Sequence, residues 1–209
     1  MIVQYFYSKR RLENFSDLVI AILSVAMVLQ IPVSRIIESD DFTRLIKGIF
    51  VFFLNFFVIG SFWHRHHKAI DKLEYITSKI ILCNHIFLFF LALLPIFTKL
   101  IMENLNESRP IILSNIVFIL ANLTFIVLLR QTYEQTPSDE QHGLKIINKN
   151  LVKYIWLNLL IQGFMFLGMI FSFIGKQRMS AIFLILFPLF ITFLNMIIEE
   201  RGLKEKIKK

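Results

Sequence analysis

The arrangement of the apolar residues constrains this chain most, because they lie in long blocks separated by short charged stretches. A helix needs about 20 predominantly apolar residues to cross the roughly 30 Å of hydrocarbon in a bilayer. The composition agrees, since 56% of the residues are hydrophobic and 18% are charged, whereas soluble domains have about 45–50% and about 25%. The sequence therefore predicts an all-α integral membrane protein.

Six blocks are long enough to be transmembrane helices, and together they form a single domain over residues 1–209. Their approximate ranges are 15–33, 45–63, 77–101, 111–129, 151–174 and 182–198. Pro32 and the charged stretch 35–41 end the first span, and Pro110 opens the fourth at a favoured position. The longest connection, approximately 131–150, is polar and predicts a loop without its own core. The sequence shows no strong internal repeat, so any symmetry must come from copies of the chain.

The basic residues of the loops predict the orientation of these spans. With a cytoplasmic N-terminus, the inner side holds Lys9, Arg10, Arg11, Arg65, Lys68, Lys72, Lys79, Arg130, Lys145, Lys149, Lys153, Arg201, Lys204, Lys206, Lys208 and Lys209. The outer side holds Arg35, Arg44, Lys47, Lys99, Arg109, Lys176 and Arg178. The inner side has more than twice as many, so both termini are predicted to be cytoplasmic and the loop 131–150 lies on the same side.

Several function classes are disfavoured by the same pattern. The net charge of +8 is distributed between apolar blocks rather than collected with aromatic residues on one face, so no nucleic-acid partner is expected. No phosphate loop, nucleophile elbow or His-Glu-x-x-His pair occurs, so neither an enzyme nor a cofactor or small-molecule substrate is expected. Spans two to six contain no Asp or Glu well inside, which weakens a proton-coupled transporter. Cys83 is interpreted as a small buried hydrophobe.

The first span differs from the others because Ser16 and Asp17 stand at its membrane boundary. They fit a helix N-cap, or they belong to a buried polar network, since charged residues at the start of a span usually face the protein interior. Candidate partners lie in the second and third spans. These are Ser61, Trp63, His64, Arg65, His66, His67, Asn84 and His85.

The histidines of that group also raise the question of a metal site. Only His64 and His67 have the three- or four-residue spacing that places side chains on one helix face. No cysteine is nearby, and Asp71 and Glu74 are expected to be solvated loop carboxylates. No metal site is therefore predicted, and the histidines are expected to bond to the carboxylate of the first span or to water.

A stripe on the first span offers a candidate for a passive pore. Ile22, Ala26 and Leu29 have the spacing i, i+4, i+7 of one helix face. Such a stripe is usually packing surface, but a narrow apolar constriction can also gate an ion pore by dewetting. Spacing alone leaves both interpretations open.

Three motifs, within residues 11–98, resemble the transmembrane protein 175 family, which comprises cation channels of endolysosomes and of bacteria. They are Arg11-x-x-x-Phe15-Ser16-Asp17 followed by Ala21-Ile22; Ser61-Phe62-Trp63-x-x-His66-His67; and Asn84 with Leu91-Ala92-Leu93-Leu94-Pro95-x-x-Thr98. The last three spans resemble the family only in number and character.

The resemblance implies a homotetramer in which the first helix of each subunit lines a central, potassium-conducting pore. By position, Ile22 matches the narrowest constriction, Leu29 a further apolar ring, and Ala26 lies between them. Family members often carry a threonine one turn beyond the constriction, where this chain has Val25 beside Ser24. A weak preference for potassium over sodium is therefore expected.

The resemblance also assigns a structural polar network. Arg11, Ser16 and Asp17 match the residues that fix the first helix against the second and third, through Trp63, His67 and Asn84.

The sequence and the resemblance together predict a passive, leak-type potassium channel, which also passes sodium and other monovalent cations. Its partners are copies of itself and the lipid bilayer, and its location is a bacterial plasma membrane. The alternative is a proton-coupled secondary transporter, or a proton pathway, that uses Asp17 and the inner-side histidines.

Overall fold

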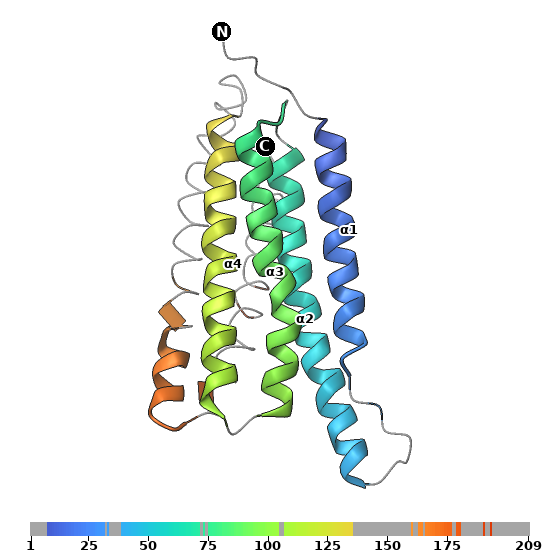
Figure 1. Ribbon diagram of the computed structural model, residues 1–209, viewed down its shortest axis with the longest axis vertical. Coiled ribbons are helices and arrows are strands. Elements are labelled where there is room, and N and C mark those ends of the chain that lie inside the picture. The colour runs from blue at the N-terminus through green and yellow to red at the C-terminus, as the bar shows by residue number, and fades with distance from the viewer. Residues whose placement is uncertain are drawn as a thin grey trace, which may run out of the picture.

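Four long helices form the part of the chain that the structure describes in most detail (Figure 1). The structure is a computed structural model, and it describes residues 8–31, 33, 39–71, 73, 75–104, 107–135, 160, 163–164, 166–176, 179–180, 190 and 193. The helices are α1 (Lys9–Val28), α2 (Ser39–Asp71), α3 (Ser78–Glu103) and α4 (Ser108–Glu134). The all-helical prediction is confirmed over these elements.

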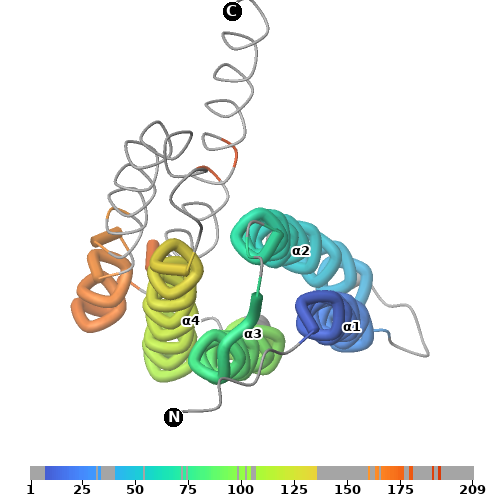
Figure 2. Tube along the Cα trace, turned by 90° about the horizontal axis from the view of Figure 1, so that it is seen from above, coloured from blue at the N-terminus to red at the C-terminus, as the bar shows by residue number. Residues whose placement is uncertain are grey.

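The helices run side by side with alternating direction, so the start of α1 and the end of α2 lie at the same end of the bundle (Figure 1). Seen from above, α2 and α3 form the middle, with α1 on one side and α4 on the other (Figure 2). α1 accordingly contacts both α2 and α3, and α4 packs most extensively on α3.

Phenylalanine rings form the centre of the bundle. Phe62 of α2, Phe87 of α3 and Phe125 of α4 are fully buried, and their ring centroids lie 5.0–5.7 Å apart. Tilted and edge-on ring pairs at this separation stabilise the fold by more than the burial of their apolar area alone. This cluster holds α2, α3 and α4 together and so sets how each helix is rotated.

Among the described residues, three helical segments are long and apolar enough to cross a membrane: Asp41–Asp71 of α2, Ser78–Ile101 of α3 and the whole of α4. They coincide with the second, third and fourth predicted spans. α2 and α4 are longer than predicted, since α2 runs from Ser39 to Asp71 and α4 continues to Glu134. Residues 131–134 are therefore helical rather than part of the predicted loop. Burial of Gln131 and Thr132 and a 3.0 Å ion pair between Arg130 and Glu134 hold this last turn.

The remaining predicted spans have different outcomes. α1 occupies the first predicted span but begins six residues earlier than expected, and its first turns are too charged for it to join the three apolar helices. Residues 166–173 are helical within the fifth predicted span. Most of the fifth span, nearly all of the sixth and residues 136–150 of the predicted loop lie outside the described residues and stay predictions.

Candidate functional site

The buried face of α1 positions the candidate site. Leu12, Ser16, Ile20, Leu23 and Met27 are buried, and their spacing of three or four residues makes them one helix face. α1 starts after Ser8, so Ser16 and Asp17 lie two turns inside the helix. The N-cap interpretation of these two residues is therefore wrong, because a cap precedes the first turn.

Ser16 begins a chain of buried hydrogen bonds that joins three helices. The Ser16 hydroxyl donates to the Leu12 carbonyl oxygen over 2.8 Å, and Asn84 Nδ2 of α3 donates to Ser16 Oγ over 2.9 Å. Asn84 Oδ1 then accepts from His66 Nε2 of α2, with 2.6 Å between the two atoms. Ser16, Asn84 and His66 are at most 1% exposed. A polar group at this depth is stable only when it is hydrogen-bonded.

A second connection lies beside the first and joins α1 to α2. Trp63 Nε1 donates to Asp17 Oδ1 over 2.8 Å. His67, one turn further along α2, stacks on the Trp63 ring with 5.9 Å between centroids. Two neighbouring residues of α1, Ser16 and Asp17, thus contact α3 and α2 respectively, which fixes the rotation of α1 about its own axis.

His66, one of the candidate partners predicted from the sequence, takes the place in the buried network that the resemblance assigned to His67. The four-residue spacing along α2 shows why His66 is the buried one. Phe62, His66 and Ile70 follow each other at four-residue steps and are all buried, whereas Trp63 and His67 are exposed. His66 lies between apolar residues on both sides of its helix face, Phe62 and Ile70, whereas the position four residues after His67 is the charged Asp71.

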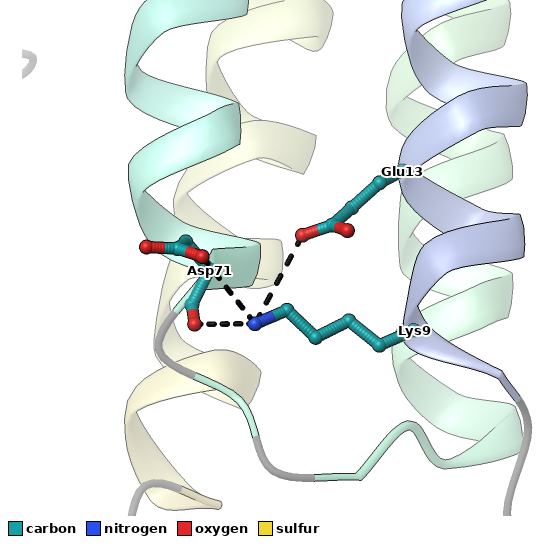
Figure 3. Close-up of polar contacts among 3 residues, drawn as sticks. All are labelled: Lys9, Glu13 and Asp71. Carbon is teal, nitrogen blue, oxygen red and sulfur yellow. Dashed lines mark hydrogen bonds and ion pairs between the residues drawn. The ribbon is translucent and has the colours of Figure 1, made fainter.

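Arg11 is not brought to this network. It is exposed, and its side chain makes no hydrogen bond or ion pair within the described part of the chain. A different basic residue of α1, Lys9, reaches α2 instead: Lys9 lies 3.5 Å from Asp71 and 4.0 Å from Glu13 (Figure 3). Asp71, expected to be a solvated loop carboxylate, is the last residue of α2 and takes part in this ion cluster.

The residues predicted to line a pore lie on the opposite face of α1. Ile22, Val25 and Leu29 are 63%, 61% and 80% exposed, and Ala26 at the edge of this face is half-buried. Leu18, one turn before Ile22, is also exposed. We call Leu18, Ile22, Val25 and Leu29 the outer stripe of α1. Its steps of four, three and four residues keep these side chains on one face that the described chain leaves uncovered.

The histidine run shows no arrangement for metal binding among the described residues, where no group of three His, Cys, Asp or Glu side chains converges. His66 points into the core toward Asn84, and His67 stacks on Trp63. The α-helical period separates these neighbouring side chains by about 100°, so the two histidines serve different contacts.

The geometry defines a membrane helix bundle whose first helix is fixed by polar contacts on one face and is apolar on the other. Comparison with known proteins matches part of the chain to a family of channels. Residues 11–95 match the family described as "Endosomal/lysosomal potassium channel TMEM175". This match confirms, over residues 11–95, the resemblance predicted from the motifs, and the matching family is described as a channel rather than an enzyme.

Two relatives extend the comparison. A protein of Chryseobacterium sp. (strain P1-3), named a potassium channel, is 27% identical over 121 residues, which cover 58% of this chain and 63% of that protein. The match thus spans less than two thirds of the relative. The crystal structure of a lysosomal potassium-selective channel TMEM175 homolog from Chamaesiphon minutus superposes with a TM-score of 0.67. It covers 88% of this chain and 96% of that chain at 19% identity, so it shows a shared fold.

Proposed function

We propose that this protein is a passive, potassium-preferring cation channel whose pore is lined by α1 from several copies of the chain. The observation that carries the proposal is the outer stripe, Leu18, Ile22, Val25 and Leu29, four exposed apolar residues on one face of α1. The opposite face carries Ser16, which together with Asp17 holds the helix in one rotation. A pore-lining helix needs a fixed rotation about its axis. If α1 rotated by about 100°, the next side chains along the helix would face the pore in place of the outer stripe.

The copies are four in number, as the family resemblance implies. With four α1 helices around one axis, the Ile22 side chains form the narrowest apolar ring and the Leu29 side chains a second one, with Ala26 between them. Ions lose part of their hydration at such a ring, and its width and water content control conduction. Conduction is electrodiffusion, without coupling to an energy source, and needs no cofactor.

Val25 is the proposed selectivity layer, and its side chain favours a low discrimination between potassium and sodium. The neighbouring hydroxyl does not replace the missing threonine, because Ser24 Oγ donates to the Ile20 carbonyl oxygen of its own helix over 3.1 Å. An apolar Val25 therefore stands on the exposed stripe with no described hydroxyl beside it on that face. We expect sodium and other monovalent cations to pass in addition to potassium, which the channel prefers only weakly.

The ends of the helices support the proposed orientation. Lys9, Arg10 and Arg11 at the start of α1, Lys68 at the end of α2 and Lys79 at the start of α3 all lie at one end of the bundle. Concentration of basic residues at one membrane face marks the cytoplasmic side. Both termini are placed there in the proposal, within a bacterial plasma membrane as the family resemblance implies.

The test is the current through purified protein in a planar bilayer, with potassium on one side and sodium on the other. We expect a steady current that reverses between zero and the potassium equilibrium potential, and Ile22→Asn is expected to raise conductance or reduce selectivity, because a polar ring retains water. Leu82→Asn is the matched control, since Leu82 on α3 is 60% exposed but lies outside the stripe.

Two results would contradict the proposal. Unchanged currents and permeability ratios in Ile22→Asn, or an equal change in Leu82→Asn, would show that α1 does not line the pore. Saturating flux that requires a proton gradient would instead favour a secondary transporter that uses Asp17 and the inner histidines.

A further inference from the structure

An ion cluster ties the inner ends of α1 and α2 together (Figure 3). Lys9 Nζ, on the first residue of α1, lies 3.5 Å from Asp71 Oδ1 and also donates to the backbone carbonyl oxygen of Asp71. Glu13 Oε1, one turn further along α1, lies 4.0 Å from the same ammonium group. One ammonium group thus connects two helices through residues that are 62 positions apart in the sequence.

Because Asp71 is the last residue of α2, Lys9 contacts both its carboxylate and the end of the helix backbone. Asp71 ends α2, and the last carbonyl groups of a helix have no partner within the helix and carry the negative end of its dipole. Lys9 supplies a positive donor to one of them from a different helix. Glu13 holds the lysine side chain from its own helix, so the ammonium group is directed across the gap rather than into solvent.

Among the described residues, the cluster is one of two places where polar groups of α1 bond to α2. The other is the hydrogen bond between Asp17 and Trp63, eight residues or about 12 Å along the helix axis. Further out, α1 is held by the buried apolar residues Ile20, Leu23 and Met27. In the described part of the chain, every polar contact from α1 to another helix therefore comes from residues 9–17.

We propose that Lys9, Asp71 and Glu13 form a salt-sensitive latch that holds the inner end of α1 in its conducting position. This inference rests on the proposed role of α1 as the pore-lining helix. Lys9 and Asp71 have 28% and 69% of their side-chain area exposed, so ions in the cytoplasm reach the pair. The screening length falls from about 8 Å at 0.15 M salt to about 3 Å at 1 M, which weakens the latch.

A mutant cycle of Lys9→Met, Asp71→Asn and the double variant tests the latch, with single-channel open probability in planar bilayers as the measurement. Lys9→Met is expected to lower open probability at least threefold. Asp71→Asn keeps the backbone carbonyl and gives a smaller loss, and the double variant is no worse than Lys9→Met. Raising the inner salt from 0.15 M to 1 M lowers the wild-type open probability and leaves Lys9→Met unchanged.

Arg130→Met is the matched control. It removes an ion pair at the same end of the bundle, but one that lies within α4, between Arg130 and Glu134 at 3.0 Å. Wild-type open probability in Lys9→Met would overturn the latch, and so would an equal loss in Arg130→Met.

A distance measurement separates failure of the latch from failure of the proposed function. Spin labels are attached at Arg10→Cys on α1 and Lys79→Cys on α3 in a Cys83→Ala background, and labelled chains are diluted with unlabelled ones. Lys9→Met is expected to broaden the distance distribution, while Arg130→Met leaves it unchanged. An unchanged distribution in Lys9→Met overturns the latch even if the wild-type protein carries no current, a result that would itself refute only the channel.

Discussion

Replacing Asn84 by leucine should measure how strongly the polar network holds α1. Asn84 is fully buried in α3 and bonds to two other helices, through Ser16 Oγ at 2.9 Å and His66 Nε2 at 2.6 Å. Leucine has a similar size but no polar atom, so Asn84→Leu removes both bonds without leaving a large cavity. The donor on His66 then remains in the core without its partner.

The magnitude follows from these contacts. Interhelical hydrogen bonds in membrane proteins average about 0.6 kcal/mol each, and a buried donor left without a partner costs about 1–3 kcal/mol. Two bonds and one unsatisfied nitrogen together predict a destabilisation of about 2–4 kcal/mol. Because 1.4 kcal/mol corresponds to a factor of ten, the ratio of folded to unfolded protein falls about 30- to 700-fold.

Asn115→Leu in α4 is the matched control. Asn115 is also fully buried, but its Nδ2 donates only to the Ile111 carbonyl oxygen of its own helix over 3.0 Å. Its Oδ1 is buried without a hydrogen-bond partner in the structure. Leucine removes that unsatisfied acceptor, so we expect stability to stay unchanged or to rise by about 1–2 kcal/mol.

The assay is reversible unfolding in mixed micelles with increasing denaturing detergent, followed by tryptophan fluorescence and circular dichroism. The two variants are expected to differ in free energy of unfolding by at least about 2 kcal/mol. Equal changes would refute the reasoning, because they would show that bonds between helices contribute no more than a local bond within one helix.

Three further perturbations test other contacts of the bundle. Trp63→Phe keeps the ring but removes the donor to Asp17, and it should lower the free energy of unfolding by about 1–2 kcal/mol. Asp17→Ala should reduce the yield of folded oligomer in size-exclusion chromatography without altering ion preference, because the carboxylate bonds to α2 rather than lining the outer stripe; a stable oligomer with changed preference would contradict this. Phe62→Ala should cost about 3–5 kcal/mol in the same unfolding assay, whereas Phe53→Ala, on an exposed position of α2, should cost less than about 1 kcal/mol.

The sequence by itself determined the helices and the motifs. A bilayer demands about 20 apolar residues for each crossing, so the second, third and fourth spans were visible as blocks, and α2, α3 and α4 contain them. Ser16, Trp63 and Asn84 stood out for a related reason, because polar groups at the edge of an apolar block must find partners. The ends of the helices were harder to predict from the sequence: α4 continues through Gln131 and Thr132, which are polar but buried.

Only the tertiary structure decided which polar side chains meet. His66 and His67 are neighbours in the sequence, and the rotation of α2, set by the packing of Phe62 on Phe87 and Phe125, directs His66 to Asn84. Lys9 and Asp71 meet because α1 and α2 run in opposite directions, which brings the first residue of one helix to the last residue of the other. The apolar blocks of the sequence show where the helices lie, but the ends, rotation and partners of each helix come from the packing of all helices together.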